Sequence, residues 1–170
     1  MRLLRGLAPL MVLLVLAGCG TDPTPATSSP GDEVVDAAKA PALEFTATTL
    51  EGEKFEGASL EGTPAVLWFW APWCPTCFSQ IPTVSGLGQD YAGRVNVVAV
   101  GGLDTQDAIE ESAGRIKHVT HLVDDEGTVW KHFRVTAQST FTVIDADGEI
   151  VGQGYLEDEE LEELVADLAG

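Results

Sequence analysis

Two cysteines near the middle of the chain, Cys74 and Cys77 in "WFWAPWCPTCF", are the residues best suited to chemistry. Such a pair can bind a metal, form a static crosslink or exchange electrons. Structural zinc needs four ligands, and His118, His121 and His132 show no finger-like spacing to a second pair, so we expect no metal. A disulfide across so short a loop removes little entropy from the unfolded chain, which argues against a purely structural crosslink.

Thiol–disulfide exchange fits the elements expected around the pair. The apolar run Ala65–Trp70 predicts a strand buried on both faces, and a helix should begin near Cys74. The unpaired N–H groups and the dipole at a helix N-terminus stabilise a thiolate. We predict that Cys74 is exposed at this tip and attacks, and that the better shielded Cys77 resolves the mixed disulfide. Pro75 suits the first helical turn because it lacks an N–H.

Strands and helices alternate through the rest of the chain, which predicts a three-layer α/β/α sandwich around a mixed sheet. The last helix is amphipathic and is expected to bury Leu161, Leu164, Val165 and Leu168. The remaining predicted elements are hairpins over 43–57 and 140–154, strands over 95–100 and 120–125, and helices over 104–114, 127–133 and 157–170, with Asp104 as an N-cap and Asp147-Gly148 as a hairpin turn.

The N-terminal region resembles an export signal over residues 1–18, with arginines, an apolar run and then small residues. The run ends in "LAGC", similar to a bacterial lipobox, which predicts lipidation of Cys19; an ordinary secretory signal with a chance cysteine is the alternative. Residues 19–40 are rich in Pro, Ser and Thr and predict a disordered tether before a domain over 41–170. The expected location is extracytoplasmic, with a lipid anchor in the cell membrane.

The formal net charge is −18 at pH 7, which argues against binding nucleic acid or anionic lipid headgroups. If one of the three cysteines carries lipid, the other two pair or act together, and a disulfide persists in an oxidising compartment. No long apolar seam is left over, so we expect a monomer.

The motif and its context resemble the thioredoxin superfamily. The closest likeness is to its exported branch, which includes the TlpA, ResA and DsbE-like proteins. It covers roughly residues 41–170 and rests on "FWAPWCPTC", "DDEGTVWKHFRV" and "FTVIDADGEIVG". The resemblance implies a thioredoxin-like fold with an N-terminal β-hairpin, and exchange with exported proteins that carry thiols or disulfides. A membrane electron donor or acceptor is the further expected partner, and no cofactor is expected.

The candidate substrate-binding residues around the cysteines are Trp73, Pro75, Thr76, Gln138 and Ser139. For Trp73, an apolar contact with substrate and packing in the core remain equally open from the sequence.

Three positions depart from the family pattern. Ser139 stands where the family has a cis-proline; a cis bond before a non-proline residue costs about 3–4 kcal/mol, so we expect a trans bond and a hydroxyl near the sulfurs. Gln80 stands where the ResA-like branch has a glutamate, and Trp68 where thioredoxin buries an aspartate. Both are candidates for tuning the thiols, although a solvated helix position is slightly favoured for Gln80.

The leading hypothesis is therefore a membrane-anchored thiol–disulfide oxidoreductase. Two alternatives remain. One is a catalytically weak lipoprotein of the same fold that binds a metal or a protein partner at the altered Ser139 loop. The other is a thiol peroxidase of the redoxin group, disfavoured because Ala71 occupies the place of that group's threonine three residues before Cys74.

Overall fold

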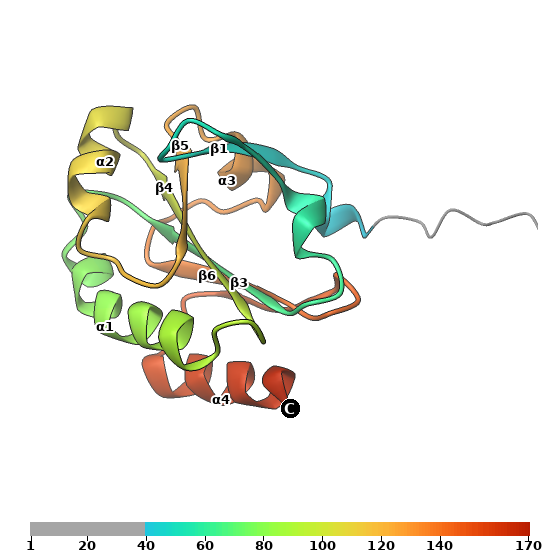
Figure 1. Cartoon of the computed structure of the whole chain (residues 1–170). Helices are drawn as coiled ribbons and strands as arrows, with labels where there is room; N and C mark the ends of the chain where they lie inside the picture. The colour runs from blue at the N-terminus through green and yellow to red at the C-terminus, as the bar shows by residue number, and fades with distance from the viewer. Residues whose placement is uncertain (1–39) are drawn as a thin grey trace, which may run out of the picture. The chain divides into compact units, whose positions relative to one another are not determined.

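Seven strands form one mixed sheet in the computed structural model, which describes residues 40–170 (Figure 1). The strand order is β2-β1-β5-β4-β3-β6-β7, in which β3 and β4, and β4 and β5, run parallel while the other neighbours are antiparallel. The strands are β1 (Thr46–Thr49), β2 (Lys54–Glu56), β3 (Ala65–Trp70), β4 (Asn96–Gly102), β5 (Thr120–Asp124), β6 (Thr140–Ile144) and β7 (Ile150–Gly154). The predicted mixed sheet and both predicted hairpins are confirmed.

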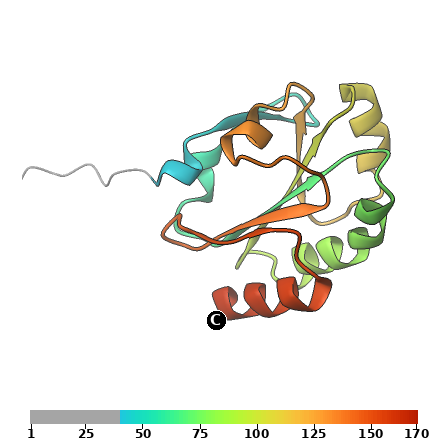
Figure 2. The ribbon, with the colours of Figure 1, turned by 180° about the vertical axis from the view of Figure 1, so that it is seen from behind.

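Helices cover both faces of this sheet (Figures 1 and 2). One face packs against α1 (Pro75–Asp90), α2 (Gln106–Ala113) and α4 (Asp158–Ala169). The other packs against α3 (Thr128–His132) and two 3-10 turns, η1 (Pro41–Leu43) and η2 (Gly57–Leu60). The predicted three-layer α/β/α sandwich is therefore confirmed.

The central strand β3 is buried along its whole length, as its apolar run predicts. Because side chains alternate along a strand, Val66, Trp68 and Trp70 face the α1 side, while Leu67 and Phe69 join the opposite cluster. Every one of these five side chains is no more than 1% exposed. This packing fixes the end of β3, from which the cysteine motif begins.

Helix α1 carries the cysteine motif at its start and is held by the core along one face. Cys77, Val84 and Leu87 are buried on that face, and α4 packs beside α1 through Leu161 and Val165. The predicted apolar face of α4 is confirmed, because Leu164 and Leu168 also pack against this cluster.

The start of α2 differs from the prediction by one residue. Thr105 rather than Asp104 is the N-cap, and its hydroxyl accepts a hydrogen bond from the N–H of Ala108 at 3.4 Å. The carboxylate of Asp104 instead accepts from the N–H of Thr105 at 2.8 Å. Both residue types favour this position, so the sequence alone could not separate them.

The predicted signal over 1–18, the lipidation of Cys19 and nearly all of the tether over 19–40 lie outside the described residues. Within residues 40–170, no helix combines the length and apolar character needed to cross a membrane.

Candidate active site

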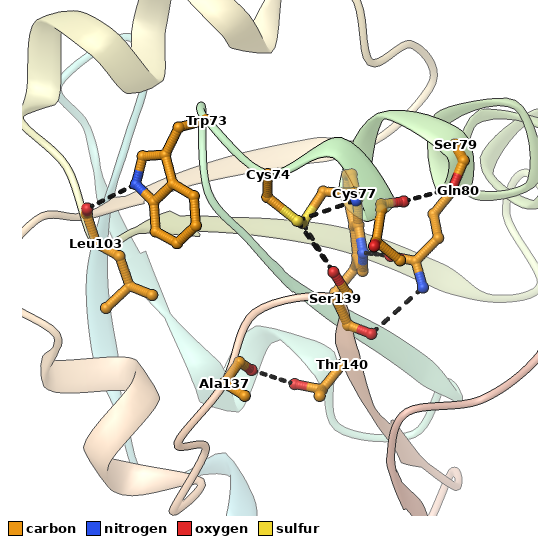
Figure 3. Close-up of a disulfide and its surroundings, with 11 residues drawn as sticks. Trp73, Cys74, Cys77, Ser79, Gln80, Leu103, Ala137, Ser139 and Thr140 are labelled. Atoms are coloured by element: carbon orange, nitrogen blue, oxygen red, sulfur yellow. Dashed lines mark hydrogen bonds between the residues drawn. A yellow bond between two sulfur atoms is a disulfide. The ribbon is translucent and has the colours of Figure 1, made fainter.

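Cys74 and Cys77 are joined in a disulfide at the N-terminus of α1, with their Cα atoms 5.3 Å apart (Figure 3). Cys74 is the N-cap of the helix, and its sulfur accepts a hydrogen bond from the N–H of Cys77 at 3.0 Å. Pro75 follows at the first helical position, as predicted. The sulfur of Cys74 thus occupies the place of the side-chain oxygen that normally caps a helix.

The predicted difference in exposure between the two cysteines is wrong for this disulfide form. Cys74 is 2% exposed and Cys77 is 1% exposed. Cys74 is buried because its sulfur turns toward the helix N-terminus and meets the segment that contains Ser139. In this disulfide form, Cys74 therefore presents almost no surface to a substrate sulfur.

Ser139 lies directly against the sulfurs, immediately before β6. Its hydroxyl oxygen is 3.0 Å from the sulfur of Cys74 and 3.2 Å from that of Cys77. The residue is buried, has a left-handed φ of 65° and donates its N–H to the carbonyl of Phe69 at 2.8 Å. No cis peptide bond occurs within residues 40–170, so the expected trans bond between Gln138 and Ser139 and the expected hydroxyl near the sulfurs are both found.

Gln80 is buried, so the slightly favoured prediction of a solvated helix position is wrong. The indole N–H of Trp68 donates to its Oε1 at 2.8 Å, and its Nε2 donates to the carbonyl of Ser139 at 3.3 Å. An indole can only donate, which fixes the orientation of the amide. A sequence signal was available, because Gln80 follows Cys77 by three residues and precedes Val84 by four, the spacing of one helix face.

Trp73 is 52% exposed beside the disulfide, so the alternative of core packing is wrong. Its indole N–H donates to the carbonyl of Leu103 at 3.2 Å (Figure 3). Leu103 is also 52% exposed and has a left-handed φ of 58°. The sequence analysis missed Leu103, although β3 and β4 are parallel and their ends meet at the same sheet edge.

The other predicted site residues surround this centre. Pro75 and Thr76 are exposed on the first turn of α1, and Gln138 is half-buried next to Ser139. The structure therefore brings Trp73, the cysteines and the segment before β6 to one place.

The electrostatics of α1 favour a thiolate at its start. Its first turn contains no acidic residue, whereas the first turn of α2 contains Asp107 and that of α4 contains three acids. The positive end of the α1 dipole is therefore left without a carboxylate from its own first turn. Within the described part of the chain, no group of three or more His, Cys, Asp or Glu side chains could hold a metal ion, which gives the metal-binding alternative no support.

The model of the AhpC/TSA family matches residues 38–153. The soluble secreted antigen MPT53 of Mycobacterium tuberculosis is 42% identical over 109 residues, which cover 62% of this chain. The match spans 61% of that antigen, so the chain corresponds to about three fifths of the length of this relative.

Two solved structures extend the likeness over most of their length. MTB dsbF, described in its mixed oxidized and reduced forms, is 40% identical with a TM-score of 0.71, covering 75% of this chain and 97% of that one. A secreted Mycobacterium tuberculosis disulfide oxidoreductase homologous to E. coli DsbE is 36% identical with a TM-score of 0.67. The match covers 75% of this chain and 98% of that one. The predicted fold and the predicted kinship with DsbE-like proteins are both confirmed.

Proposed function

We propose that this chain, which belongs to the AhpC/TSA family, is a thiol–disulfide oxidoreductase that acts on exported proteins. The observation that carries the proposal is the Cys74–Cys77 disulfide capping α1. The oxidoreductase similar to DsbE supports the same chemistry, because the cysteine pair of this chain lies in the region that resembles it.

Exchange proceeds in two displacements. The thiolate of Cys74 attacks one sulfur of a substrate disulfide, the substrate S–S bond breaks, and the other substrate sulfur leaves as a thiolate that takes a proton from water. Cys77 then releases its proton to water and attacks the sulfur of Cys74. The Cys74–Cys77 bond forms and the remaining substrate sulfur leaves as a thiolate. The substrate gains two electrons and the cysteine pair loses two.

The reverse steps oxidise a substrate dithiol and reduce the cysteine pair. The relative reduction potentials of the two couples set the direction, and a membrane electron donor or acceptor then restores the starting state. The exposed surfaces of Trp73, Pro75 and Thr76, together with Gln138, form the contact area for the substrate. Measuring the potential of the Cys74–Cys77 couple separates a reductant from an oxidant.

Trapping the mixed disulfide tests this proposal. A Cys77→Ser variant lacks the resolving sulfur, so it should accumulate covalent complexes with exported proteins through Cys74. Non-reducing electrophoresis and mass spectrometry identify these complexes. The matched Cys74→Ser variant keeps one cysteine of the pair but should trap none. Equal trapping by both variants, or trapping by neither, contradicts the proposal.

We also propose that a lipid on Cys19 anchors the domain to the cell membrane on its outer side. The support is the "LAGC" pattern that follows an apolar run. A Cys19→Ala variant should lose incorporation of a labelled fatty acid and leave the membrane fraction. Unchanged labelling of that variant would exclude this anchor.

Peroxide consumption distinguishes the thiol peroxidase alternative. Ala71 replaces the threonine of that group's pattern and is buried. The purified, reduced domain should therefore reduce insulin disulfides with dithiothreitol while consuming hydrogen peroxide no faster than a Cys74→Ser variant.

A further inference from the structure

The hydroxyl of Ser139 lies close to both sulfurs of the pair, at 3.0 Å from Cys74 and 3.2 Å from Cys77. A disulfide sulfur has no hydrogen to give. The hydroxyl of Ser139 must therefore be the donor in these contacts. A hydrogen bond to a neutral sulfur is weak, whereas the same bond to a thiolate is charge-assisted and much stronger.

The backbone around Ser139 holds the hydroxyl in this position. Its N–H donates to the carbonyl of Phe69 at 2.8 Å, and its own carbonyl accepts from Nε2 of Gln80 at 3.3 Å. Gln80 is in turn held by the indole N–H of Trp68 at 2.8 Å. Both anchors come from elements of the buried core, β3 and α1, so the hydroxyl is oriented before any charge develops.

This arrangement also explains how Ser139 keeps an unusual conformation. Its φ of 65° lies in the left-handed region, which is costly for a residue other than glycine. The hydrogen bonds on both sides of the residue maintain that φ. They point its side chain at the sulfurs (Figure 3).

We propose that the Ser139 hydroxyl is a catalytic hydrogen-bond donor shared by the two cysteine sulfurs, and that Gln80 and Trp68 are its positioning residues. This inference rests on the proposed exchange activity. The hydroxyl donates to whichever of the two sulfurs is negatively charged. Before attack on a substrate disulfide, it stabilises the Cys74 thiolate. In the reverse reaction, a substrate thiolate attacks Cys74, the Cys74–Cys77 bond breaks, and the hydroxyl stabilises the Cys77 thiolate. The serine keeps its proton throughout, so the electron and proton balance of the exchange is unchanged.

The proposal predicts two properties of the cysteine pair, the ionisation of Cys74 in the reduced protein and the equilibrium between the reduced and disulfide forms. Removing the donor destabilises the thiolate, so Cys74 should ionise at higher pH and the disulfide should become favoured over the reduced pair. A hydrogen bond to a charged group is strong enough to move the ionisation midpoint by about one pH unit. The equilibrium constant with glutathione should shift about tenfold toward the disulfide, which corresponds to a potential lower by about 30 mV.

The test compares wild type with Ser139→Gly, because glycine removes the hydroxyl and tolerates the left-handed φ. Thiolate absorbance near 240 nm reports the ionisation of Cys74, and equilibration with glutathione reports the redox constant. Neither quantity depends on how easily a protein substrate reaches the site. His118→Gly is the matched control, since His118 is an exposed residue with a similar φ of 61°, and it should change neither quantity.

Two further variants distinguish the loss of a positioned hydrogen-bond donor from a change in packing around the sulfurs. Ser139→Asn keeps a side-chain N–H donor and tolerates the left-handed φ, so it should return both measurements part of the way to wild type. Gln80→Met removes the amide and should shift both in the same direction as Ser139→Gly, by a smaller amount. If Ser139→Gly does not fold, Ser139→Ala replaces it and is judged by the same criteria.

Shifts in both quantities for Ser139→Gly, partly restored by Ser139→Asn, support the donor role. Wild-type values in Ser139→Gly overturn it and leave the proposed exchange activity standing, provided that the wild type reduces insulin. A wild type that neither equilibrates with glutathione nor reduces insulin overturns both proposals.

Discussion

At the scale of single residues, the sulfur of Cys74 has two hydrogen-bond donors, the N–H of Cys77 and the hydroxyl of Ser139. Neither donor titrates in the physiological range. The neighbouring Gln80 and Trp68 also lack an ionisable group. Stabilisation of the thiolate therefore depends on fixed dipoles rather than on an acid that must first reach the correct protonation state.

Trp73 should distinguish protein substrates from small disulfides. Replacing this exposed indole with alanine removes an apolar contact area beside the reacting sulfurs, and we expect kcat/KM for insulin to fall roughly tenfold. The value of kcat/KM for glutathione disulfide should change less than twofold, because so small a substrate does not contact that surface. Steady-state kinetics with the two substrates measure the difference.

Tyr155→Ala is the control for this substitution. Tyr155 is an aromatic residue of similar exposure, 54%, and lies outside the candidate site. Its removal should leave both rates unchanged. An equal loss with both substrates for Trp73→Ala would contradict a role in substrate contact.

The site residues differ in how well the sequence predicts them. Cys74 and Cys77 are found where the motif indicates, because their relation depends on local helix geometry. Ser139 lies beside them at the position that the family resemblance implied. The burial of Cys74 was not predicted, since it depends on how closely the segment before β6 approaches. Leu103 was missed for a similar reason: its contact with Trp73 exists only because two strands end at one sheet edge.

At the scale of elements, the position of α1 decides where the sulfurs lie. Gly88 brings this helix close to the segment before β5, and a Cβ at this position would lie less than 3.0 Å from the carbonyl oxygen of His118. Gly88→Ala must therefore push α1 and that segment apart. We expect a loss of about 1–3 kcal/mol in the free energy of unfolding, measured by urea denaturation.

Gly86 in the same helix supplies the comparison. A Cβ there would have no other atom within 4 Å, so Gly86→Ala should be neutral or stabilising by up to about 1 kcal/mol. If both variants lose the same stability, the close approach at Gly88 is not what restricts α1.

The elements themselves are well predicted from the sequence. The fully apolar run of β3 and the amphipathic pattern of α4 identify their types directly, because burial on two faces or on one face imposes different spacings. The start of α2 is not decided by the sequence, since Asp104 and Thr105 can both cap a helix, and only the backbone distinguishes them.

At the scale of the whole domain, His121 links folding to pH. This half-buried residue on β5 has its Nε2 3.1 Å from the carbonyl of Ile116, and its buried Nδ1 has no partner in the described structure. Burial is the main cause that lowers the pKa of His121 below its usual 6.5. Its folded-state pKa is depressed, so its contribution to stability is present above pH 6.5 and is lost as pH falls through the folded-state pKa.

We expect urea midpoints of the wild type to fall between pH 7.5 and pH 5.5 by more than those of His121→Gln. Glutamine keeps a donor for the carbonyl of Ile116 but cannot gain a proton in this range. Comparing the two proteins cancels the contribution of the carboxylates. A pH dependence that is the same in both proteins would show that His121 is not the group responsible.

The most direct measurement of the central claim is alkylation of the fully reduced domain with iodoacetamide across pH, followed by peptide mass mapping. The account predicts that Cys74 is modified first, at a pH well below the value of about 8.5 at which an ordinary thiol ionises, while Cys77 stays largely unmodified until the protein unfolds. Faster modification of Cys77, or equal modification of both cysteines only near the pH of an ordinary thiol, would contradict it.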